Sequence, residues 1–470
     1  MAATVISSPY SRRFDLSALA RVPRRDVDRV ALADLLRYTF VCPPHTTVTG
    51  VKALSLGFPE EEGASANDFH PIDWPTTASF SGSLDDAVSK YHQLLCSALR
   101  ASTERMRNPW LLQSGGKDSS SIAVALREAR PDAICLTYLG GREENEVASA
   151  RSTARKLGLR HEALVCDPAR AFDRYVEIAG RLPFLTCDFA FLGYVDLCFE
   201  VRRSGGDGVL DGLGSDVYMG ATISARQRAL AVLARMNVDP SGLLDLPLVR
   251  DSFVACYLIG SAQMTPFERL FPGSRFSDAE VDALLGEPLS QKSRSRLDVL
   301  LTGHADASPE ARRMLALSIA EAGAAFPKGM LACLGTGIQI GYPFCHPALV
   351  EWVKTLPTSY LLGRDGTNKI LVRQHIEQHV GTLPYVNQKG SFRFDLVTLA
   401  QRRFDQVLSI AEMTAQLVPG APTWLKTNRA RFKNKYFASK FYLLAVMLPW
   451  LAGRIHAHET TNDAASPGST

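Results

Sequence analysis

The sequence predicts an α/β protein with a doubly wound parallel sheet and a mostly helical C-terminal half. Between residues 110 and 210, short apolar segments typical of buried strands alternate with longer segments in which apolar residues recur every three or four positions. This alternation favours parallel strands joined by helical crossovers, with helices on both faces of the sheet. After residue 216 the strand patterns disappear and helical periodicity dominates.

The individual elements follow from local patterns. A helix is expected after Ser83, because apolar residues recur from Leu84 to Leu99 behind a residue that favours the N-cap position. Strands are predicted at residues 110–112, 133–138, 162–165 and 208–210, with helices at 119–127 and 143–157 between them. In the second half, helical periodicity is expected over 307–322 and 346–354.

The composition is that of a large globular protein, with 470 residues of which 46% are hydrophobic. The net charge is +4, from 52 basic and 48 acidic side chains. We therefore expect no nucleic-acid partner and a small molecule or peptide as substrate. The basic stretch 426–440 is interleaved with aromatic residues and is predicted to be an amphipathic helix that packs on the core.

Cysteine usage and the chain ends predict a location in the cytoplasm. The nine cysteines form no CxxC pair, as expected for free thiols in a reducing compartment. Charges interrupt the first thirty residues, which argues against a secretory signal. The longest apolar run, 441–452, is shorter than the roughly 20 residues of a membrane span, so no membrane partner is expected.

The strongest functional pattern is the segment WLLQSGGKDSSS, residues 110–121, in which an apolar strand leads through a Ser- and Gly-rich turn into a helix. Gly115 and Gly116 allow the backbone to approach a phosphate, and the first amides of the helix point at the anion. Ser114 and Ser119 add hydroxyl donors. An ordinary capped strand-to-helix turn is the alternative for this segment.

Two acidic residues suggest a metal site. Asp118 would repel a phosphate by itself but suits a Mg²⁺ ion that bridges phosphates. A second turn with the sequence VLDGLGSDVYMG, residues 209–220, also follows a short strand. Since such loops meet at the carboxyl edge of a parallel sheet, Asp118 and Asp216 are predicted to share one Mg²⁺.

Ordered motifs resemble the synthetase domain of asparagine synthetases and of their relatives, the β-lactam synthetases, carbapenam synthetases and lasso-peptide cyclases. The resemblance extends from about Val30 to the C-terminal helix. It rests on the phosphate loop 114–119, the acidic patch 143–148, the second loop 211–216, a "VPF"-like stretch at 342–344 with the "VE…LP" helix 351–357 after it, a "TKxxLR"-like stretch at 368–373 and a lysine turn at 388–390.

The resemblance implies an adenine-nucleotide α-hydrolase-like (PP-loop) fold that binds ATP and Mg²⁺. A carboxylate would attack the α-phosphorus, pyrophosphate would leave, and an amine would then displace AMP. The triphosphate would lie over residues 114–119 and the adenine beside the strand 136–138. The implied nucleotide contacts are Leu112, Ser114, Gly115, Gly116, Lys117, Asp118, Ser119, Leu136, Tyr138, Gly212, Gly214 and Ser215. Lys117 fills the variable position of the loop, where it also could simply face water.

Three residues are candidates for the catalytic steps. Lys389 resembles the family lysine that stabilises charge on the acyl-adenylate and the later tetrahedral intermediate. Lys328 stands where relatives have a basic residue before the "VPF" stretch, and would reach a phosphate or lie at the surface. Leu213 replaces a Glu or Tyr that relatives use to manage the proton of the amine, so the second step needs another base or a neutral amine. Cys345 and His346 stand where relatives have "LD" after "VPF"; His346 is the base to test first, and a capped or solvated histidine is the alternative.

The N-terminal part departs from the glutamine-dependent relatives. In those enzymes an N-terminal cysteine attacks glutamine, whereas here Met1 is followed by Ala2 and the first cysteine is Cys42. Residues 1–80 are interpreted as a reduced, vestigial glutaminase-like domain, residues 81–458 as the ATP-binding domain and residues 459–470 as a disordered tail. Hydrolysis of glutamine is therefore not expected.

These observations leave several functions open. An amide ligase of the macrolactam or β-lactam type, with a precursor peptide or a small molecule as substrate, is the leading hypothesis. An asparagine synthetase that uses free ammonia, a sulfur-transferring or nucleobase-modifying PP-loop enzyme, and a non-catalytic partner protein that keeps only the fold are the alternatives. The sequence does not distinguish attack within one molecule from attack by a second molecule.

Overall fold

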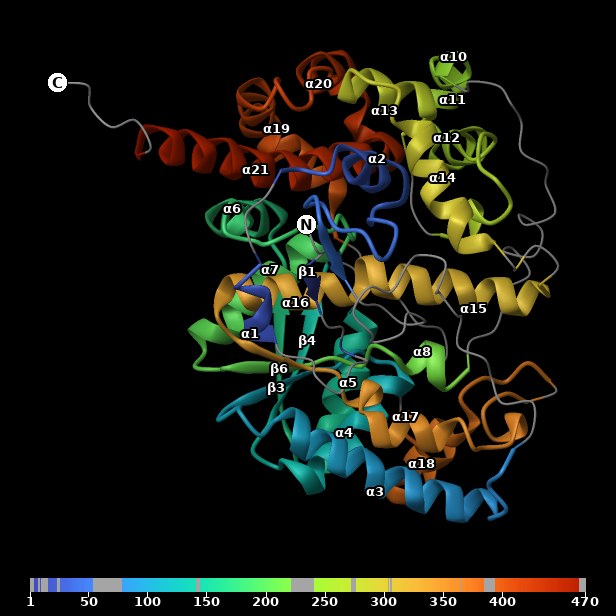
Figure 1. Ribbon diagram of the computed structural model, residues 1–470. Coiled ribbons are helices and arrows are strands. Elements are labelled where there is room, and N and C mark those ends of the chain that lie inside the picture. Colours follow the sequence, from blue (N-terminus) through green and yellow to red (C-terminus); the bar gives the residue numbers. More distant parts are fainter. Residues whose placement is uncertain are drawn as a thin grey trace.

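The computed structural model describes residues 4–6, 9, 16–22, 26–53, 78–140, 144–220, 241–271, 276–302, 304, 307–363, 365–383 and 394–464. A five-stranded parallel sheet lies at its centre, with the order β5-β4-β3-β6-β7 (Figure 1). The strands are β3 (Pro109–Leu112), β4 (Ile134–Leu139), β5 (Arg160–Val165), β6 (Gly208–Leu210) and β7 (Gln339–Gly341).

The order of the strands creates a topological switch point. From β3 the chain moves outward through β4 to β5, and it then returns to the other side of β3 to form β6. In open α/β sheets, ligands bind in the crevice outside the carboxyl ends of the strands where the direction of winding changes. The loops after β3 and β6 lie at this point and carry the two predicted acidic turns.

Helices cover both faces of the sheet, as predicted. Alternate strand residues divide between two buried clusters: Leu111 and Cys135 face one, and Trp110 and Leu136 face the other. The first face is covered by α3 (Leu84–Ser102), α4 (Lys117–Ala129), α5 (Glu144–Leu157), α17 (Pro347–Val353) and α18 (Ile370–Val380). The second face is covered by α6 (Pro168–Ala179), α7 (Phe191–Arg203) and α16 (Phe326–Thr336), with α19 (Leu396–Met413) and α21 (Lys435–Ala464) packed beyond them.

The structure describes further strands and α-helices besides these. They are β1 (Thr4–Ile6), β2 (Val51–Ala53), α1 (Leu16–Leu19), α2 (Arg29–Tyr38), α8 (Ser215–Tyr218), α10 (Ser241–Leu244), α11 (Pro247–Arg250), α12 (Phe253–Gly260), α13 (Asp278–Leu285), α14 (Ser290–Leu301), α15 (Pro309–Ala320) and α20 (Ala421–Asn428). β1 and β2 pair in parallel as a separate two-stranded sheet.

The first predicted helix begins where the sequence places it. Ser83 accepts a hydrogen bond from the amide of Asp86, whose carboxylate accepts one from the amide of Ser83 in return. This capping box satisfies two amides that have no partner within the helix. The predicted strands and the helices around them are confirmed to within a few residues.

The C-terminal half is mostly helical, as predicted, and it also contains the strand β7, whose three residues are too few to show a strand pattern. One expectation for this half is wrong. The basic stretch 426–440 is not one helix, because Asn434 is extended and its side chain accepts a hydrogen bond from the amide of Tyr436, which starts α21 anew. Phe432, Tyr436 and Phe437 are nevertheless buried in the core, as predicted.

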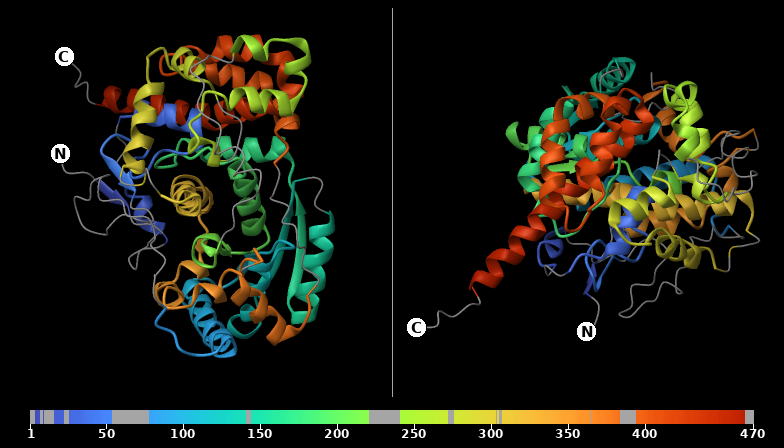
Figure 2. Two further views of the ribbon diagram at one scale, coloured as in Figure 1. Left: turned by 90° about the vertical axis from the view of Figure 1, so that its right-hand side faces the viewer. Right: turned by 90° about the horizontal axis from the view of Figure 1, so that it is seen from above.

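The predicted helix over 307–322 is part of a longer rod. α15 continues through one π-helical segment, Glu321–Ala325, directly into α16. Figure 2 shows this rod end-on in its left view. The C-terminal helices lie above it, and helices that cover the sheet lie below it. The rod joins the two halves of the protein and packs on both the short helix α8 and the edge strand β7.

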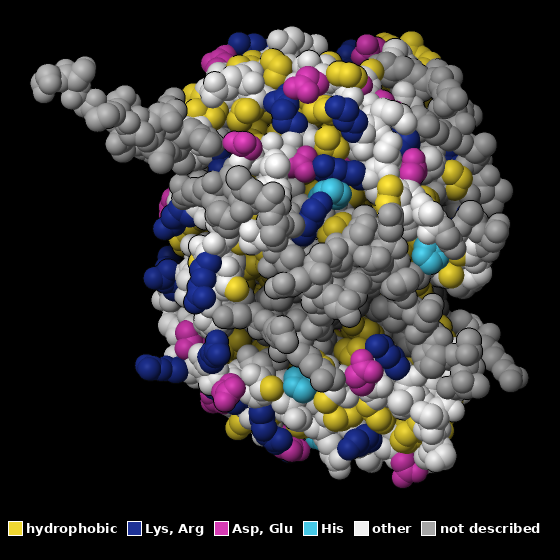
Figure 3. All heavy atoms as spheres, viewed as in Figure 1, with side chains coloured by type: hydrophobic (Ala, Val, Ile, Leu, Met, Phe, Trp, Pro, Cys, Tyr) yellow, Lys and Arg dark blue, Asp and Glu magenta, His cyan; other side chains and the backbone are white. Residues whose placement is uncertain are grey.

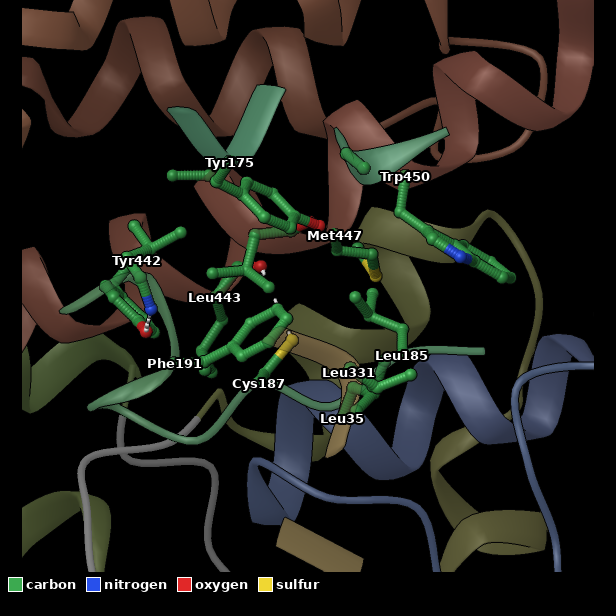
Figure 4. Close-up of a cluster of buried hydrophobic side chains, with 14 of the residues drawn as sticks. Leu35, Tyr175, Leu185, Cys187, Phe191, Leu331, Tyr442, Leu443, Met447 and Trp450 are labelled. Atoms are coloured by element: carbon green, nitrogen blue, oxygen red, sulfur yellow. Dashed lines mark hydrogen bonds between the residues drawn. The ribbon is translucent and has the colours of Figure 1, made fainter. Parts of the chain in front are cut away.

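The N-terminal segment is integrated into the core. α2 packs against α13, α14 and α21, and its Leu35 points into the cluster that Figure 4 shows around Tyr175, Leu443 and Met447. The hydroxyl of Tyr175 donates a 2.6 Å hydrogen bond to the carbonyl of Val446 within this cluster. Burial of each such large side chain contributes about 1.5–3 kcal/mol. The glutaminase-like origin of residues 1–80 stays a prediction.

Among the described residues, one helical segment, Lys435–Ile455 within α21, is long and apolar enough to cross a membrane by length and composition. In its most apolar stretch, 89% of the residues are buried within the protein. A core helix of a globular protein meets the same criterion, so the segment is weak evidence for a membrane span.

Candidate active site

The loop between β3 and α4 holds its own shape through its serines. The hydroxyl of Ser119 lies 3.1 Å from the hydroxyl of Ser114 and accepts a hydrogen bond from the amide of Ser114. The amide of Gly116 donates to the hydroxyl of Ser114 at 3.2 Å, and the hydroxyl of Ser120 donates to the carbonyl of Gly116 at 2.8 Å. The serines predicted as phosphate donors therefore also fix the loop before any ligand binds.

The first amides of α4 are suited to bind an anion. Gly116 is the N-cap residue, with an extended backbone and no side-chain cap. A Cβ at Gly116 would lie 3.2 Å from the Ser114 hydroxyl, so glycine keeps this turn open. The amides of Lys117 and Asp118 belong to the first helical turn. Amides of this turn have no acceptor within the helix, and they lie at the positive end of the helix dipole.

The second loop follows β6 and leads into the short helix α8. Asp211 is held by the loop, because its carboxylate accepts hydrogen bonds from the hydroxyl of Tyr194 at 3.0 Å and from the amide of Leu213 at 3.2 Å. Gly214 has a φ of +94°, and a Cβ there would lie 2.7 Å from the Cys345 sulfur. This position therefore requires glycine, which turns Ser215 and Asp216 toward the sheet edge.

The structure brings the two predicted acidic residues together. A Cβ at Gly212 would lie 3.9 Å from Cβ of Asp118, which places the two loops in contact. The ammonium of Lys369 lies 2.7 Å from Oδ1 of Asp118 and 2.5 Å from Oδ1 of Asp216. Both carboxylates therefore converge on one cation, as a shared ion would require.

Lys369 is the main residue that the sequence analysis missed. Its side chain is 1% exposed, and its ammonium also donates to the hydroxyl of Ser215 at 2.9 Å. Its backbone has a φ of +59°, a left-handed conformation that non-glycine residues rarely adopt. Only its place in the "TKxxLR"-like stretch could have indicated it, since neither spacing nor charge distinguishes it from other lysines.

The residues around the loops fit a magnesium nucleotide. The carboxylate side chains of Asp118 and Asp216 are 13% and 43% exposed, so a metal ion can reach them from solvent. Gln113, which directly precedes the phosphate loop, is 2% exposed, and both polar atoms of its carboxamide lack a hydrogen-bond partner among the described residues. Such an unpaired buried amide is costly unless a ligand satisfies it.

Two further basic side chains, Lys117 and Arg313, interact electrostatically with these acids. Burial lowers the pKa of Lys117, opposed by Asp118. Burial likewise lowers the pKa of Arg313 on α15, opposed by Asp216. The side chain of Lys117 is thus partly buried and does not simply face water. Arg313 adds a guanidinium that was not predicted from the sequence.

The strand predicted to lie beside the adenine is next to the phosphate loop. Leu112 pairs with Leu136, and the carbonyl of Leu136 accepts a hydrogen bond from the amide of Gln113 at 2.8 Å. The hydroxyl of Tyr138 donates a 2.6 Å hydrogen bond to the buried carboxylate of Asp196. That carboxylate also binds two arginines, so the position of the Tyr138 ring is fixed.

Two of the three predicted catalytic residues lie in the described part of the chain. Lys328 has its ammonium 5.9 Å from the ring centroid of Tyr194, whose hydroxyl binds Asp211 of the second loop. Lys328 has its ammonium 3.6 Å from a carboxylate oxygen of Asp188. His346 precedes α17 and lines a cavity of about 760 Å³ beside the edge strand β7; neither the phosphate loop nor Lys369 lines this cavity. Burial lowers the pKa of His346, and its Nδ1 has no partner among the described residues.

Lys389 and Glu143 lie outside the described residues, together with the rest of the lysine turn 388–390. Their predicted roles stay predictions. The acidic patch is described only from the start of α5 onward.

The switch-point loops, the open start of α4 and the paired acids define a nucleotide-binding α/β enzyme of the PP-loop class. Comparison with known families matches residues 91–408, about two thirds of the chain, to the asparagine synthase family. The chain belongs to this family, and it is an ATP-dependent, AMP-forming carbon–nitrogen ligase. The family uses ATP, typically with Mg²⁺. No curated protein matches the chain.

Proposed function

We propose that this ligase adenylates a carboxylate and passes the acyl group to an amine without hydrolysing glutamine, as a macrolactam- or β-lactam-type cyclase or tailoring synthetase. The convergence of Asp118 and Asp216 on one cation carries the ligase part of this proposal. The carboxylate oxygen forms a bond to the α-phosphorus and pyrophosphate leaves. The amine then bonds to the acyl carbon, AMP leaves, and the amine loses a proton.

The two loops divide the work of holding the nucleotide. The amides at the start of α4 bind phosphate oxygens, and the serines of the loop keep those amides in place. Asp118 and Asp216 would hold Mg²⁺, which neutralises charge on the pyrophosphate leaving group. Lys369 compensates the negative charge of both carboxylates and keeps them aligned on each other.

The independence from glutamine is supported by the burial of the thiols. All nine cysteines of the sequence are free and buried. Cys42, the first of them, is fully buried, and burial followed by the charge of Asp34 raises its pKa well above the ordinary thiol value. A nucleophilic cysteine needs an accessible thiol with a lowered pKa. The amine is therefore proposed to come from the substrate itself or from a second small molecule.

The second half-reaction needs a base, which Leu213 cannot supply. Leu213 packs against the core, and only its backbone takes part in the loop's hydrogen bonds. We assign charge stabilisation to Lys389 and phosphate contact to Lys328, with His346 as the base. The unpaired Nδ1 of His346 and the cavity that it lines support a contact with the substrate.

Incubation with ATP, Mg²⁺ and candidate acids is expected to release AMP and pyrophosphate in equal amounts. For an acid that carries its own amine, mass spectrometry is expected to find a product lighter by one water, because the amide forms within one molecule. Glutamine is expected to leave the rate unchanged. Ammonia-dependent formation of asparagine would instead favour the asparagine synthetase alternative, and the absence of any pyrophosphate exchange would favour a non-catalytic protein.

Lys389→Met is expected to lower the rate of amide formation about a hundredfold. In other enzymes, removal of one group that stabilises a developing negative charge lowers the rate by a similar factor. Single-turnover measurements of AMP release and of amide formation check this. The exposed lysine Lys354, which pairs with Glu351 on the surface, provides a control in Lys354→Met. A loss smaller than threefold in Lys389→Met would make Lys389 a structural residue.

The surface agrees with a small-molecule or peptide substrate. Figure 3 shows basic and acidic side chains interspersed on the displayed face, without a field of one sign. We propose a cytoplasmic location and neither a nucleic-acid nor a membrane partner; a precursor peptide is the macromolecular partner that this chemistry would admit.

A further inference from the structure

Three histidines from two helices meet on the face of the sheet that α3 and α18 cover. His92 lies on α3, and His375 and His379 lie one turn apart on α18. Each offers a ring nitrogen, and these three nitrogens lie within 4.8 Å of one another. The rings of His92 and His379 stack with their centroids 4.0 Å apart. His375 is fully buried, the side chain of His92 is 15% exposed, and His379 borders solvent.

The outer nitrogen of each ring is held by its own partner. Nε2 of His92 lies 3.1 Å from the carboxylate of Glu128, which can only accept a hydrogen bond, so this nitrogen carries a proton. Nδ1 of His379 lies 3.0 Å from the carbonyl of His375, so it too donates. Nδ1 of His375 lies 2.9 Å from the hydroxyl of Ser121, which can donate or accept.

The inner nitrogens are consequently the ones that can offer lone pairs to a metal ion. Because the rings of His92 and His379 are stacked with an angle of 21° between their planes, one of these rings must turn out of the stack for both lone pairs to reach one ion. Nδ1 of His92 and Nε2 of His379 are both unprotonated in the neutral rings. Nε2 of His375 lies 2.9 Å from Nδ1 of His92, and in the protein without metal a single proton on His375 satisfies this contact. If the Ser121 hydroxyl turns to accept, that proton moves to Nδ1 of His375, and the inner nitrogens of all three rings then carry a lone pair.

We propose that His92, His375 and His379 form a binding site for a divalent transition-metal ion, with Zn²⁺ the best-suited ion. Three imidazole nitrogens, each oriented by a hydrogen bond from its other nitrogen, are a ligand set that zinc commonly takes. Nitrogens that bind one tetrahedral zinc lie about 3.3 Å apart, from Zn–N distances of about 2.0–2.1 Å. Nδ1 of His92 and Nε2 of His375 therefore need to separate by a few tenths of an ångström, and the ring of His379 needs to turn out of its stack on His92.

The site takes a fourth ligand from solvent. His379 is exposed, so water can reach the metal from its side. Cys96 lies on the other side of the His92 ring, 3.5 Å from Nε2, and its sulfur donates to the carbonyl of Ala125. Glu128 also faces Nε2 of His92 and orients the ring rather than binding the metal.

The site lies on helices that begin at the nucleotide loops. α18 follows directly on Lys369, and α4, which provides Ser121 and Glu128, begins beside Asp118. A metal ion would link α18 to α3. The hydrogen bonds from His375 to Ser121 and from His92 to Glu128 connect the same histidines to α4. The proposal concerns this second site and does not depend on the ligase chemistry.

Metal analysis of the full chain tests the proposal. Protein prepared without a polyhistidine tag, stripped with a chelator, loaded with Zn²⁺ and dialysed is expected to retain about one zinc per chain. His379→Ala and His92→Gln each remove a ligand and are expected to weaken binding at least about a hundredfold. Glu128→Gln removes an orienting partner and is expected to weaken binding about 10–100-fold. With Co²⁺, the unmodified protein is expected to show the visible absorption of four-coordinate cobalt.

His304→Ala is the matched control, because His304 lies outside the cluster and its hydrogen bonds to other described residues come from its backbone, which the substitution keeps. It is expected to retain zinc as the unmodified protein does. Circular dichroism of each variant checks that the fold is intact. Failure of the unmodified protein to retain zinc, or equal retention in His379→Ala, His92→Gln and the control, would overturn the proposal.

Discussion

Replacement of either paired acid, in Asp118→Asn or Asp216→Asn, is expected to abolish AMP formation while the fold remains intact. The asparagine amide keeps an oxygen of similar position but loses the charge that Mg²⁺ requires from its protein ligands. The fold is expected to survive because Lys369 keeps one carboxylate partner in each variant. Release of AMP and calorimetric titration with Mg²⁺ and ATP are the two measurements.

Asp405→Asn is the control for this pair. Asp405 is an exposed carboxylate whose nearest ion-pair partner, Arg429, is also exposed, so a change of charge there is expected to leave both measurements unchanged. Normal turnover in Asp118→Asn or in Asp216→Asn would remove the metal hypothesis. Loss of activity together with loss of the folded circular dichroism spectrum would instead reveal a structural role.

Lys369→Met is expected to destabilise the protein by about 3 kcal/mol. Removal of one partner of a buried ion pair costs about 3–5 kcal/mol, because the remaining charge stays buried without compensation. The lower end applies here, since the side chain of Asp216 is 43% exposed and solvent screens its charge. Denaturant unfolding of the two proteins at the same pH measures this difference.

Magnesium distinguishes this explanation from simple loss of packing. In Lys369→Met a divalent ion is expected to replace the missing positive charge and to raise the thermal midpoint more than it does in the unmodified protein. Lys354→Met, at an exposed surface pair, is expected to show neither effect. A Lys369→Met variant as stable as the unmodified protein, or one that responds to Mg²⁺ no more than it does, would show that Lys369 does not compensate the two acids.

Most of the fold could be predicted because the side-chain periodicity of each segment agrees with the way that parallel strands and helices connect. Residues 110–210 contain strands and helices whose periodicities differ, and the crossover rules leave few arrangements for them. The start of α3 could be predicted because Ser83 favours the N-cap position directly before the apolar periodicity begins. Short elements could not be found in this way: β7 has three residues, and its place at the sheet edge depends on pairing with β6, which lies far away in the sequence.

The same division applies to the site. Asp118 and Asp216 could be predicted because each follows a strand, and the carboxyl ends of parallel strands share one edge. Lys369 could not, because it approaches that edge from a helix start more than 150 residues beyond Asp216. The histidine cluster likewise unites residues 92, 375 and 379, and nothing in the local sequence of α3 indicates its partners.

The sequence by itself determined the strands, the helices between them and the two acidic loops, because these depend on side-chain periodicity and on the conformational freedom of glycine within a few residues. The tertiary structure alone decided that Lys369 pairs with both acids, where His346 and Lys328 lie, and which histidines meet. Those contacts depend on how helices from the two halves of the chain pack against one sheet, and burial and charge compensation are properties of that packing.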